Sequence, residues 1–410
     1  MDYLGAGFSE DTLDFDYETG INPGIDTQKK WKAELTIRDL LYHQGGFPAD
    51  PRYFNPYMNT ARQAYDPNME NLLYAGNDGS KATREATIEA ICKTPLLYEP
   101  GTKTLYSDVD YMILGVVVEQ VTGKDLDTYL KDTFYTPMGL SHITYNPLQH
   151  GFQPEDCAAT ELNGNTRDGY VTFPGVRTYT LQGEVHDEKA YYSMGGVSGH
   201  AGLFANAGDL AKLASVMLTG GYGNQRYFSQ NVMDTFTAPK SEAAGGWGLG
   251  WWREGDSDRV WYFGTQAGSD TIGHQGWTGT LVMIDPERDM VMVYLTNKIN
   301  SPVTNGRTNP NKFDGNWYTA STLGFVPQVL SIGMEDRADV SEQLLMLSAD
   351  MANESIKLVK NAGVKARSHP VVQNAESKIE VFRIYAEASG DEEMIQLADT
   401  LKQRLSVVLE

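Results

Sequence analysis

Residues 273–280 read Gly-His-Gln-Gly-Trp-Thr-Gly-Thr and lead directly into an apolar run that ends at Ile284. Similar short apolar runs precede and follow this stretch, and residues that favour turns separate them. Such spacing is typical of strands that pair with their neighbours along the chain. The pattern predicts a small antiparallel sheet within residues 241–335, with strands at Trp247–Trp252, Val260–Phe263, Thr280–Ile284 and Met290–Thr296 and a hairpin loop at 285–289.

The region upstream of this sheet is predicted to be mostly helical. Within residues 35–240, apolar residues recur at helical spacing, for example in Leu35–Leu41 and Tyr111–Val121. Residues 1–34 are mainly polar and contain glycine and proline, so an irregular N-terminal lead-in is predicted there.

Residues 340–410 have a helical pattern of their own. Near the C-terminus, apolar residues recur at steps of three and four and fall on one stripe of a helix, namely Met394, Leu397, Ala398, Leu401, Leu405 and Val408. The pattern predicts a helical extension, packed as a hairpin, that covers the sheet or another subunit. A ligand-binding module is the less favoured interpretation.

Two further motifs precede residues 273–280. They are Tyr106-Ser107-Asp108, after a Pro-Gly turn, and Gly-Val-Ser-Gly-His-Ala-Gly-Leu-Phe at 196–204. Together with the segment at 35–47, this series resembles the serine β-lactamase and penicillin-binding-protein superfamily. It is most similar to the class C-like branch of esterases and penicillin-binding proteins of the 4B type. The resemblance covers residues 1–335 and implies a serine β-lactamase-like α/β fold, in which an antiparallel sheet domain flanks a mostly helical domain.

The resemblance also implies roles for five residues. The family uses a Tyr-x-Asn motif and a Lys/His-x-Gly motif, which Tyr106 and His274 match as catalytic residues. A tyrosine acts as a base only when nearby positive charge lowers its pKa. The resemblance assigns substrate binding to Asp108, Gly276 and Trp277. Asp108 departs from the pattern, because a carboxylate stands where the family has an amide that can donate.

The family's nucleophile motif, Ser-x-x-Lys, is missing from this sequence, because no serine is followed by lysine three residues later. In the family this motif lies upstream of a stretch that Asp2-Tyr3-Leu4-Gly5 resembles. We therefore expect the chain to be N-terminally incomplete and to lack the group that Tyr106 would deprotonate.

Other residues are weaker candidates for chemistry. Ser198 is followed by His200 at the position where a nucleophile elbow needs glycine. Ser107 is adjacent to Tyr106 in an extended loop, so its side chain is predicted to point to the opposite side of the loop. His186, Asp187 and His200 have no metal-ligand spacing such as His-Glu-x-x-His. The sequence therefore predicts no cofactor and no metal site.

Composition limits the partners. The chain has 33 basic and 54 acidic residues, a net charge of −21, which disfavours binding to nucleic acid or anionic lipid. Its two cysteines exclude a disulfide framework, and no apolar stretch is long enough to span a membrane. No signal peptide precedes the first motif, and the resemblance implies a cell-envelope location for a full-length parent.

Three functional hypotheses follow. The first is a serine hydrolase that acts on a D-alanyl peptide, a β-lactam or an ester, inactive or impaired here because the nucleophile motif is absent. The second is a non-catalytic protein that binds a peptidoglycan fragment or acyl peptide. The third is complementation, in which a separate chain supplies the nucleophile and docks on the C-terminal helices.

Overall fold

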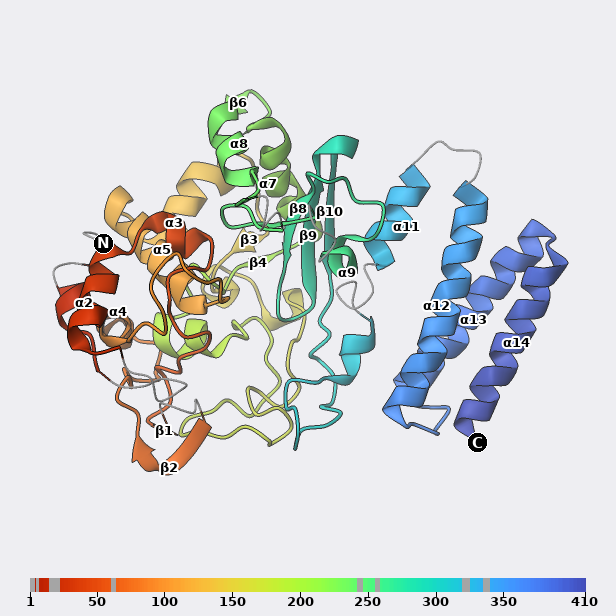
Figure 1. The fold of residues 1–410 in the computed structure, drawn as a ribbon, viewed down its shortest axis with the longest axis horizontal. Coiled ribbons are helices and arrows are strands. Elements are labelled where there is room, and N and C mark those ends of the chain that lie inside the picture. Colours follow the sequence, from red (N-terminus) through yellow and green to blue (C-terminus); the bar gives the residue numbers. More distant parts are fainter. Residues whose placement is uncertain are drawn as a thin grey trace.

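A four-stranded antiparallel sheet lies at the centre of the computed structural model (Figure 1). The structure describes residues 4, 7–14, 23–59, 64–241, 246–254, 259–318, 325–334 and 340–410. The strands follow the spatial order β10-β9-β8-β7, with bounds Met290–Leu295, Thr280–Asp285, Ile272–Gln275 and Trp252–Arg253. The predicted antiparallel sheet and its hairpin are confirmed, since β9 and β10 pair without irregularity on either side of residues 286–289.

The two faces of the sheet are covered by different helices. Val282 and Ile284 pack with Ile272 and Ala214 of α7 (Ala207–Thr219), whereas Leu281 and Met283 face a cluster that includes Phe263 of α9. This alternation follows from the two-residue period of a strand. One face of the sheet therefore packs on α7 of the helical part, and the other face packs on α9.

The helical part contains short and medium helices around α5 (Asp108–Thr122), whose Val109 and Ile113 are fully buried in one core with Leu40. Thr36 and Asp39 form a capping box at the start of α3 (Ile37–Leu41). The remaining helices of this part are α1 (Gly7–Glu10), α2 (Ile25–Glu34), α3 (Ile37–Leu41), α4 (Lys81–Lys93), α6 (Leu126–Leu130) and α8 (Gln230–Thr237).

Short strands and turns connect these helices. β3 (Ile143–Thr144) pairs with β4 (Phe204–Ala205), which closes the long segment between them. The other short elements are β1 (Tyr57–Asn59), β2 (Ala64–Glu70), β5 (Gly221–Tyr222), β6 (Gln225–Arg226), η2 (Lys131–Tyr135), η3 (Pro147–Gln149), η4 (Pro154–Asp156), η5 (Lys189–Ser193), η7 (Pro286–Arg288) and η8 (Asp314–Tyr318).

The predicted irregular lead-in over residues 1–34 is wrong at its end, where α2 forms. Two of its polar side chains are buried and bonded to backbone carbonyls at the end of α4 and just after it. The amide of Gln28 donates to the carbonyl of Leu96 at 2.7 Å, and Lys32 donates to that of Cys92. Polar composition therefore concealed a packed helix. Of the Asp2-Tyr3-Leu4-Gly5 stretch, only Leu4 lies within the described residues.

The strand predicted at Val260–Phe263 is also wrong, because these residues form the short helix α9. Phe263 is fully buried against the sheet, so the run is apolar because it covers a strand rather than because it is one. The strand predicted over Trp247–Trp252 shrinks to an isolated bridge between those two residues and to β7.

Residues 340–410 are helical as predicted, but they form three helices rather than a hairpin. α12 (Val340–Ala362), α13 (Pro370–Ser389) and α14 (Glu392–Leu409) share an apolar core that includes Phe382, Ala398 and Leu401. They lie at one end of the molecule, beyond α11 (Phe325–Met334) (Figure 1). His369 approaches Asp314 of η8 at 3.7 Å, which ties the unit to the rest of the chain.

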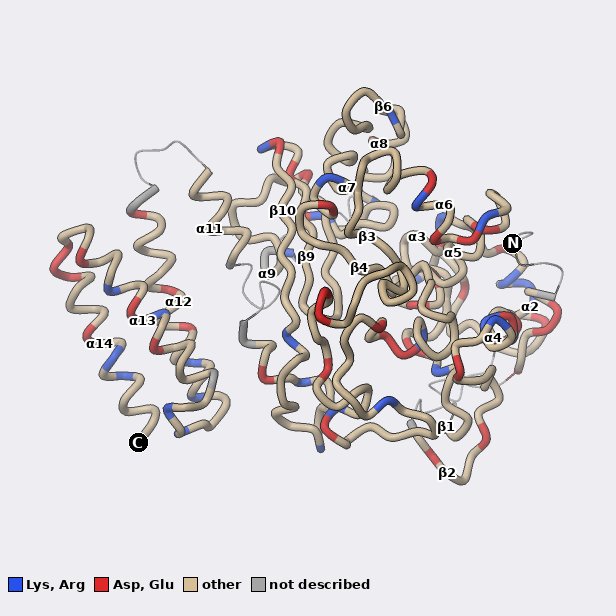
Figure 2. The backbone as a smooth tube through the Cα atoms, turned by 180° about the vertical axis from the view of Figure 1, so that it is seen from behind, with Lys and Arg blue, Asp and Glu red and all other residues tan. Residues whose placement is uncertain are grey.

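Acidic residues are spread along most of the chain. In the part that the structure describes, Figure 2 shows basic positions scattered among acidic ones rather than gathered into one tract. Among the same residues, no helix combines the length and the apolar character needed to cross a bilayer.

Candidate functional site

A cavity of about 1200 Å³ brings together residues from the helical part and from the sheet. Its wall includes Tyr106 and Asp108 before and at the start of α5, and His274, Gly276 and Trp277 at the end of β8. All five site residues predicted from the sequence therefore line one cavity. The rings of Tyr106 and His274 lie 6.0 Å apart, between centroids.

The loop before α5 fixes the position of Tyr106. Ser107 is the N-cap of α5, and its hydroxyl donates to the carbonyl of Pro48 at 2.7 Å. Ser107 is fully buried. Tyr106 is 45% exposed, and its ring packs on His43 with centroids 4.3 Å apart.

The electrostatic environment of Tyr106 opposes ionisation. Burial of the phenol in the cavity wall raises the pKa of Tyr106 above its ordinary value, and the nearby carboxylates of Asp108 and Asp187 raise it further. The charge of Lys189 acts in the opposite direction but does not outweigh them. The phenol is therefore protonated at neutral pH and acts as a hydrogen-bond donor. A base at this position would need more positive charge than the described residues supply.

His43 and Asp110 form a buried pair beneath Tyr106. Nδ1 of His43 lies 3.3 Å from Asp110 and accepts a hydrogen bond from the Ser107 amide at 3.2 Å. Burial lowers the pKa of His43 to about 3 and raises that of Asp110 well above its usual range. A neutral imidazole thus packs beneath the Tyr106 loop and accepts from its backbone.

His274 is held in one orientation at the end of β8. Its Nδ1 lies 2.7 Å from the carbonyl of Gln275 and donates to it, and its ring stacks 4.3 Å from that of Trp252. Burial, with the nearby charge of Arg259, lowers the pKa of His274. His274 is therefore a neutral hydrogen-bonding group, and Arg259, which packs on Trp252 and lines the cavity, is the cation beside it.

The turn after His274 requires glycine. A Cβ at Gly276 would collide with the Thr280 side chain, and the Gly276 amide donates to the carbonyl of Thr280 at 2.8 Å. That amide is thus used within the turn. The next residue, Trp277, is 48% exposed and presents its indole at the cavity.

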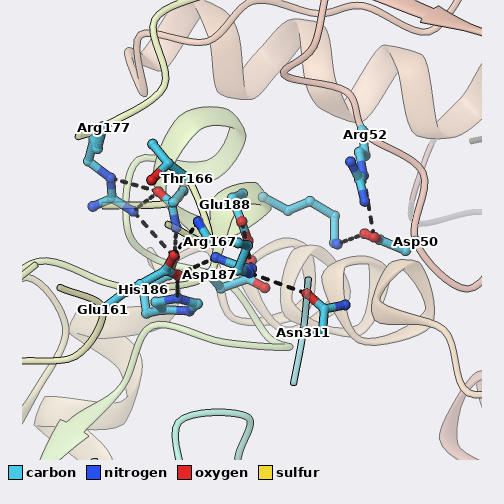
Figure 3. Close-up of polar contacts among 12 residues, drawn as sticks. Asp50, Arg52, Glu161, Thr166, Arg167, Arg177, His186, Asp187, Glu188 and Asn311 are labelled. Carbon is cyan, nitrogen blue, oxygen red and sulfur yellow. Dashed lines mark hydrogen bonds and ion pairs between the residues drawn. The ribbon is translucent and has the colours of Figure 1, made fainter. Parts of the chain in front are cut away.

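The sequence motifs give no role to a buried cation that also lines the cavity. Lys189, at the start of η5, pairs with Asp108 at 2.9 Å and also with Asp50. Asp50 in turn lies 3.5 Å from Arg52 (Figure 3). The signal available was the run of four titratable residues at 186–189 in an otherwise loop-like segment. Nothing in that run indicated which distant carboxylates it would meet.

Ser198, His200 and Asp187 form a hydrogen-bonded chain behind Lys189. The Ser198 hydroxyl lies 2.8 Å from Nδ1 of His200, and Nε2 of His200 lies 2.9 Å from Asp187. Ser198 is 2% exposed and is outside the cavity lining, so it is not placed to attack a substrate.

The same region contains a set of metal-ligand residue types. Ligand atoms of Asp108, Asp187 and His200 lie within 4.8 Å of one another. The ammonium of Lys189 already pairs with Asp108, which competes with a cation there.

A second polar network holds the segment from which this cluster projects. Arg167 pairs with Glu161 and with Glu188, the latter at 2.9 Å, and His186 lies 2.8 Å from Glu161 (Figure 3). Arg177 donates to Asn165 at 2.8 Å and to the carbonyl of Val185 at 2.9 Å. These contacts fix residues 185–188 without any regular secondary structure.

Comparison with known proteins identifies the family. A family model described as Beta-lactamase matches residues 21–316. A protein of Escherichia coli K12 named putative D-alanyl-D-alanine carboxypeptidase is 50% identical over 298 residues, which cover 72% of this chain and 64% of that protein. One of the same name from Salmonella schwarzengrund CVM19633 is 49% identical, over 72% of this chain and 65% of that protein. The chain thus spans just under two thirds of the length of these relatives.

Among solved structures, a penicillin-binding-protein homologue from Caulobacter crescentus matches with a TM-score of 0.42 and 18% identity, over 65% of this chain and 66% of that one. An octameric penicillin-binding-protein homologue from Pyrococcus abyssi matches with a TM-score of 0.42 and 15% identity, over 71% of this chain and 58% of that one. The family model and the similarity to the relatives confirm the resemblance drawn from the motifs, and the fold is of the serine β-lactamase-like α/β class. The chain belongs to the beta-lactamase family, within the superfamily of serine hydrolases that includes the penicillin-binding proteins.

Proposed function

We propose that the cavity between α5 and β8 binds the acyl-D-alanyl end of a peptide, as a serine hydrolase acting on D-alanyl peptides would. The observation that carries the proposal is the 6.0 Å separation of the Tyr106 and His274 rings across one cavity. The names of the relatives favour a D-alanyl peptide over a β-lactam or a simple ester.

In this proposal each site residue has a distinct task. Tyr106, protonated, donates a hydrogen bond to the substrate near the scissile bond. His274 and the adjacent charge of Arg259 attract the terminal carboxylate, since a guanidinium is a good partner for a carboxylate. Asp108 and Gly276 border the acyl chain, and the exposed indole of Trp277 covers it.

The proposal includes impaired catalysis. A serine hydroxyl is a poor nucleophile until a base takes its proton, and no Ser-x-x-Lys motif is present in the sequence. Among the described residues, Ser107 is the serine in the cavity lining, and both Ser107 and Ser198 are buried and hydrogen-bonded. We therefore propose that this chain by itself binds the peptide without acyl transfer. A non-catalytic protein that binds a peptidoglycan fragment or acyl peptide is the second candidate function.

Calorimetric titration and covalent labelling test this function together. We expect Nα,Nε-diacetyl-L-Lys-D-Ala-D-Ala to bind with measurable heat, and we expect labelled penicillin to leave the mass of the protein unchanged. Fusion of a family member's Ser-x-x-Lys helix should then produce a covalent penicillin adduct.

Two results would contradict the proposal. Absence of peptide binding to the folded chain would remove its basis, and a covalent adduct on the unaltered chain, mapped to a serine by peptide mass spectrometry, would contradict the impaired catalysis.

A further inference from the structure

Lys189 lies in the cavity wall between carboxylates from distant parts of the chain. Its ammonium pairs with Asp108 at the N-terminus of α5 and with Asp50 in the loop that follows α3. The Lys189 side chain is only 6% exposed, yet it borders the cavity. A buried ammonium is costly unless it is paired, so its retention beside the site calls for a reason.

The charge of Lys189 is secured by its surroundings. Burial alone would lower the pKa of Lys189, but the carboxylates of Asp108, Asp50 and Asp187 outweigh burial and raise that pKa well above its ordinary value. Lys189 is therefore an ammonium, with three N–H donors and no acceptor.

The turn that carries Lys189 is held from behind by Asp187. The Asp187 carboxylate accepts from the Ala190 amide at 2.8 Å and pairs with His200 at 2.9 Å. Burial would raise the pKa of Asp187, but His200 and Lys189 outweigh it and lower that pKa. The turn before His200 is itself clamped to α5, because a Cβ at Gly199 would collide with the carbonyl of Tyr111. Asp187 and His200 are thus positioning residues for Lys189.

We propose that Asp108 and Lys189 form one recognition unit, in which the ammonium donates and the carboxylate accepts, and that this pair binds a backbone amide on the acyl side of the peptide substrate. The inference rests on the proposed function and names a residue, Lys189, for which the sequence motifs gave no role.

The pair accounts for the departure at Asp108. A carboxamide has a donor and an acceptor on one group, whereas a carboxylate alone accepts only. With Lys189 at 2.9 Å, the two side chains together again present a donor and an acceptor to the cavity. The ammonium has three N–H donors and pairs with the two carboxylates Asp50 and Asp108, and in this proposal one N–H is donated to the substrate.

The test is a rescue experiment with charge-deleting substitutions, read as the dissociation constant of Nα,Nε-diacetyl-L-Lys-D-Ala-D-Ala. Lys189→Met removes the ammonium partner of Asp108 and the donor, so binding should weaken about tenfold or more. Asp108→Asn keeps a donor and an acceptor, and affinity should stay within about threefold. The double variant Asp108→Asn/Lys189→Met should recover to within about threefold of the unaltered chain, since one carboxamide then replaces the pair.

Matched variants separate recognition from folding. Lys124 and Asp132 form an ion pair of 2.7 Å on the exposed surface, and Lys124→Met and Asp132→Asn should leave affinity unchanged. Circular dichroism and the urea midpoint establish folding for each variant. If Lys189→Met does not fold, equal affinity of Asp108→Asn and of the double variant still supports the inference, and loss in the double variant overturns it.

The failures of the two proposals differ. If the unaltered chain binds the peptide but the double variant binds as weakly as Lys189→Met, the recognition pair is wrong and the proposed function stands. If the unaltered chain binds no peptide, the proposed function fails and the recognition pair fails with it.

Discussion

The C-terminal helices and the region around the cavity are stabilised in opposite ways. The core shared by α12, α13 and α14 is apolar, and the buried polar side chains that the structure describes there, Ser348 and Ser355, donate to carbonyls of their own helix. Around the cavity, by contrast, a lysine, an aspartate and a histidine are buried at Lys189, Asp110 and His43.

The difference separates stability from function. Burial of apolar side chains lowers the free energy of the fold without any need for specific partners. Burial of an ion costs several kcal/mol unless its partners are well placed. Among the described residues, titratable side chains are buried at the wall of the cavity and not in the core of α12, α13 and α14, which indicates that the cavity region is built for recognition. The following predictions test whether the two regions are as distinct as this comparison implies.

The largest effect is expected in the apolar core. Phe382 is fully buried in this core. Phe382→Ala should therefore lower the free energy of unfolding of the helical unit by about 3–5 kcal/mol. Ile384 on the same helix is 57% exposed, and Ile384→Ala should change it by less than about 0.5 kcal/mol. Urea unfolding followed by circular dichroism measures both. Loss of peptide binding in Phe382→Ala under folded conditions would contradict the separation of the two regions.

The second effect is a pH dependence that a buried lysine imposes. Burial lowers the pKa of Lys32 to about 7 in the folded chain, against an ordinary value of 10.5. Between these values the unfolded state binds more protons, so the contribution of Lys32 to stability rises with pH, on the order of 2 kcal/mol from pH 7 to 9. Lys32→Met should abolish this slope.

Lys30 provides the control for that pH series. It is on the same helix, but its side chain is 65% exposed. Lys30→Met should therefore keep the slope of the unaltered chain. Equal slopes for Lys32→Met and the unaltered chain, measured by urea unfolding at each pH, would show that Lys32 is charged in the folded state.

The smallest effect on stability, with a clear effect on function, is expected at Tyr106. Because this side chain is 45% exposed, Tyr106→Phe should change the free energy of unfolding by less than about 0.5 kcal/mol. Loss of one hydrogen bond to the peptide should nevertheless weaken binding by about 1 kcal/mol, a factor of about five. Tyr179, which is 52% exposed and outside the cavity lining, supplies the control Tyr179→Phe. Unchanged affinity of Tyr106→Phe would remove Tyr106 from the recognition site.

The comparison also explains which features the sequence could predict. Strands β9 and β10 and helix α14 were predictable because each buries one face, so a regular apolar period appears in the residues. Tyr106 and His274 were found through the order of the motifs rather than through any local pattern. Their meeting at 6.0 Å follows from the family's fold.

Features built from polar burial were missed. α2 escaped prediction because Gln28 and Lys32 bond to backbone carbonyls of a segment more than fifty residues away. Lys189 escaped for the same reason, since its partners Asp50 and Asp108 are distant in the sequence. A pairing of this kind leaves no period in either segment, so it becomes visible only once the chain is folded.

The most direct test is a crystal structure of the unaltered chain with bound Nα,Nε-diacetyl-L-Lys-D-Ala-D-Ala. The account predicts an intact, non-covalently bound peptide in the cavity, with its terminal carboxylate toward His274 and Arg259 and an acyl-side amide within hydrogen-bond distance of Lys189 and Asp108. A peptide bound elsewhere, or one placed in the cavity with no contact to Tyr106, His274 or Lys189, would contradict it.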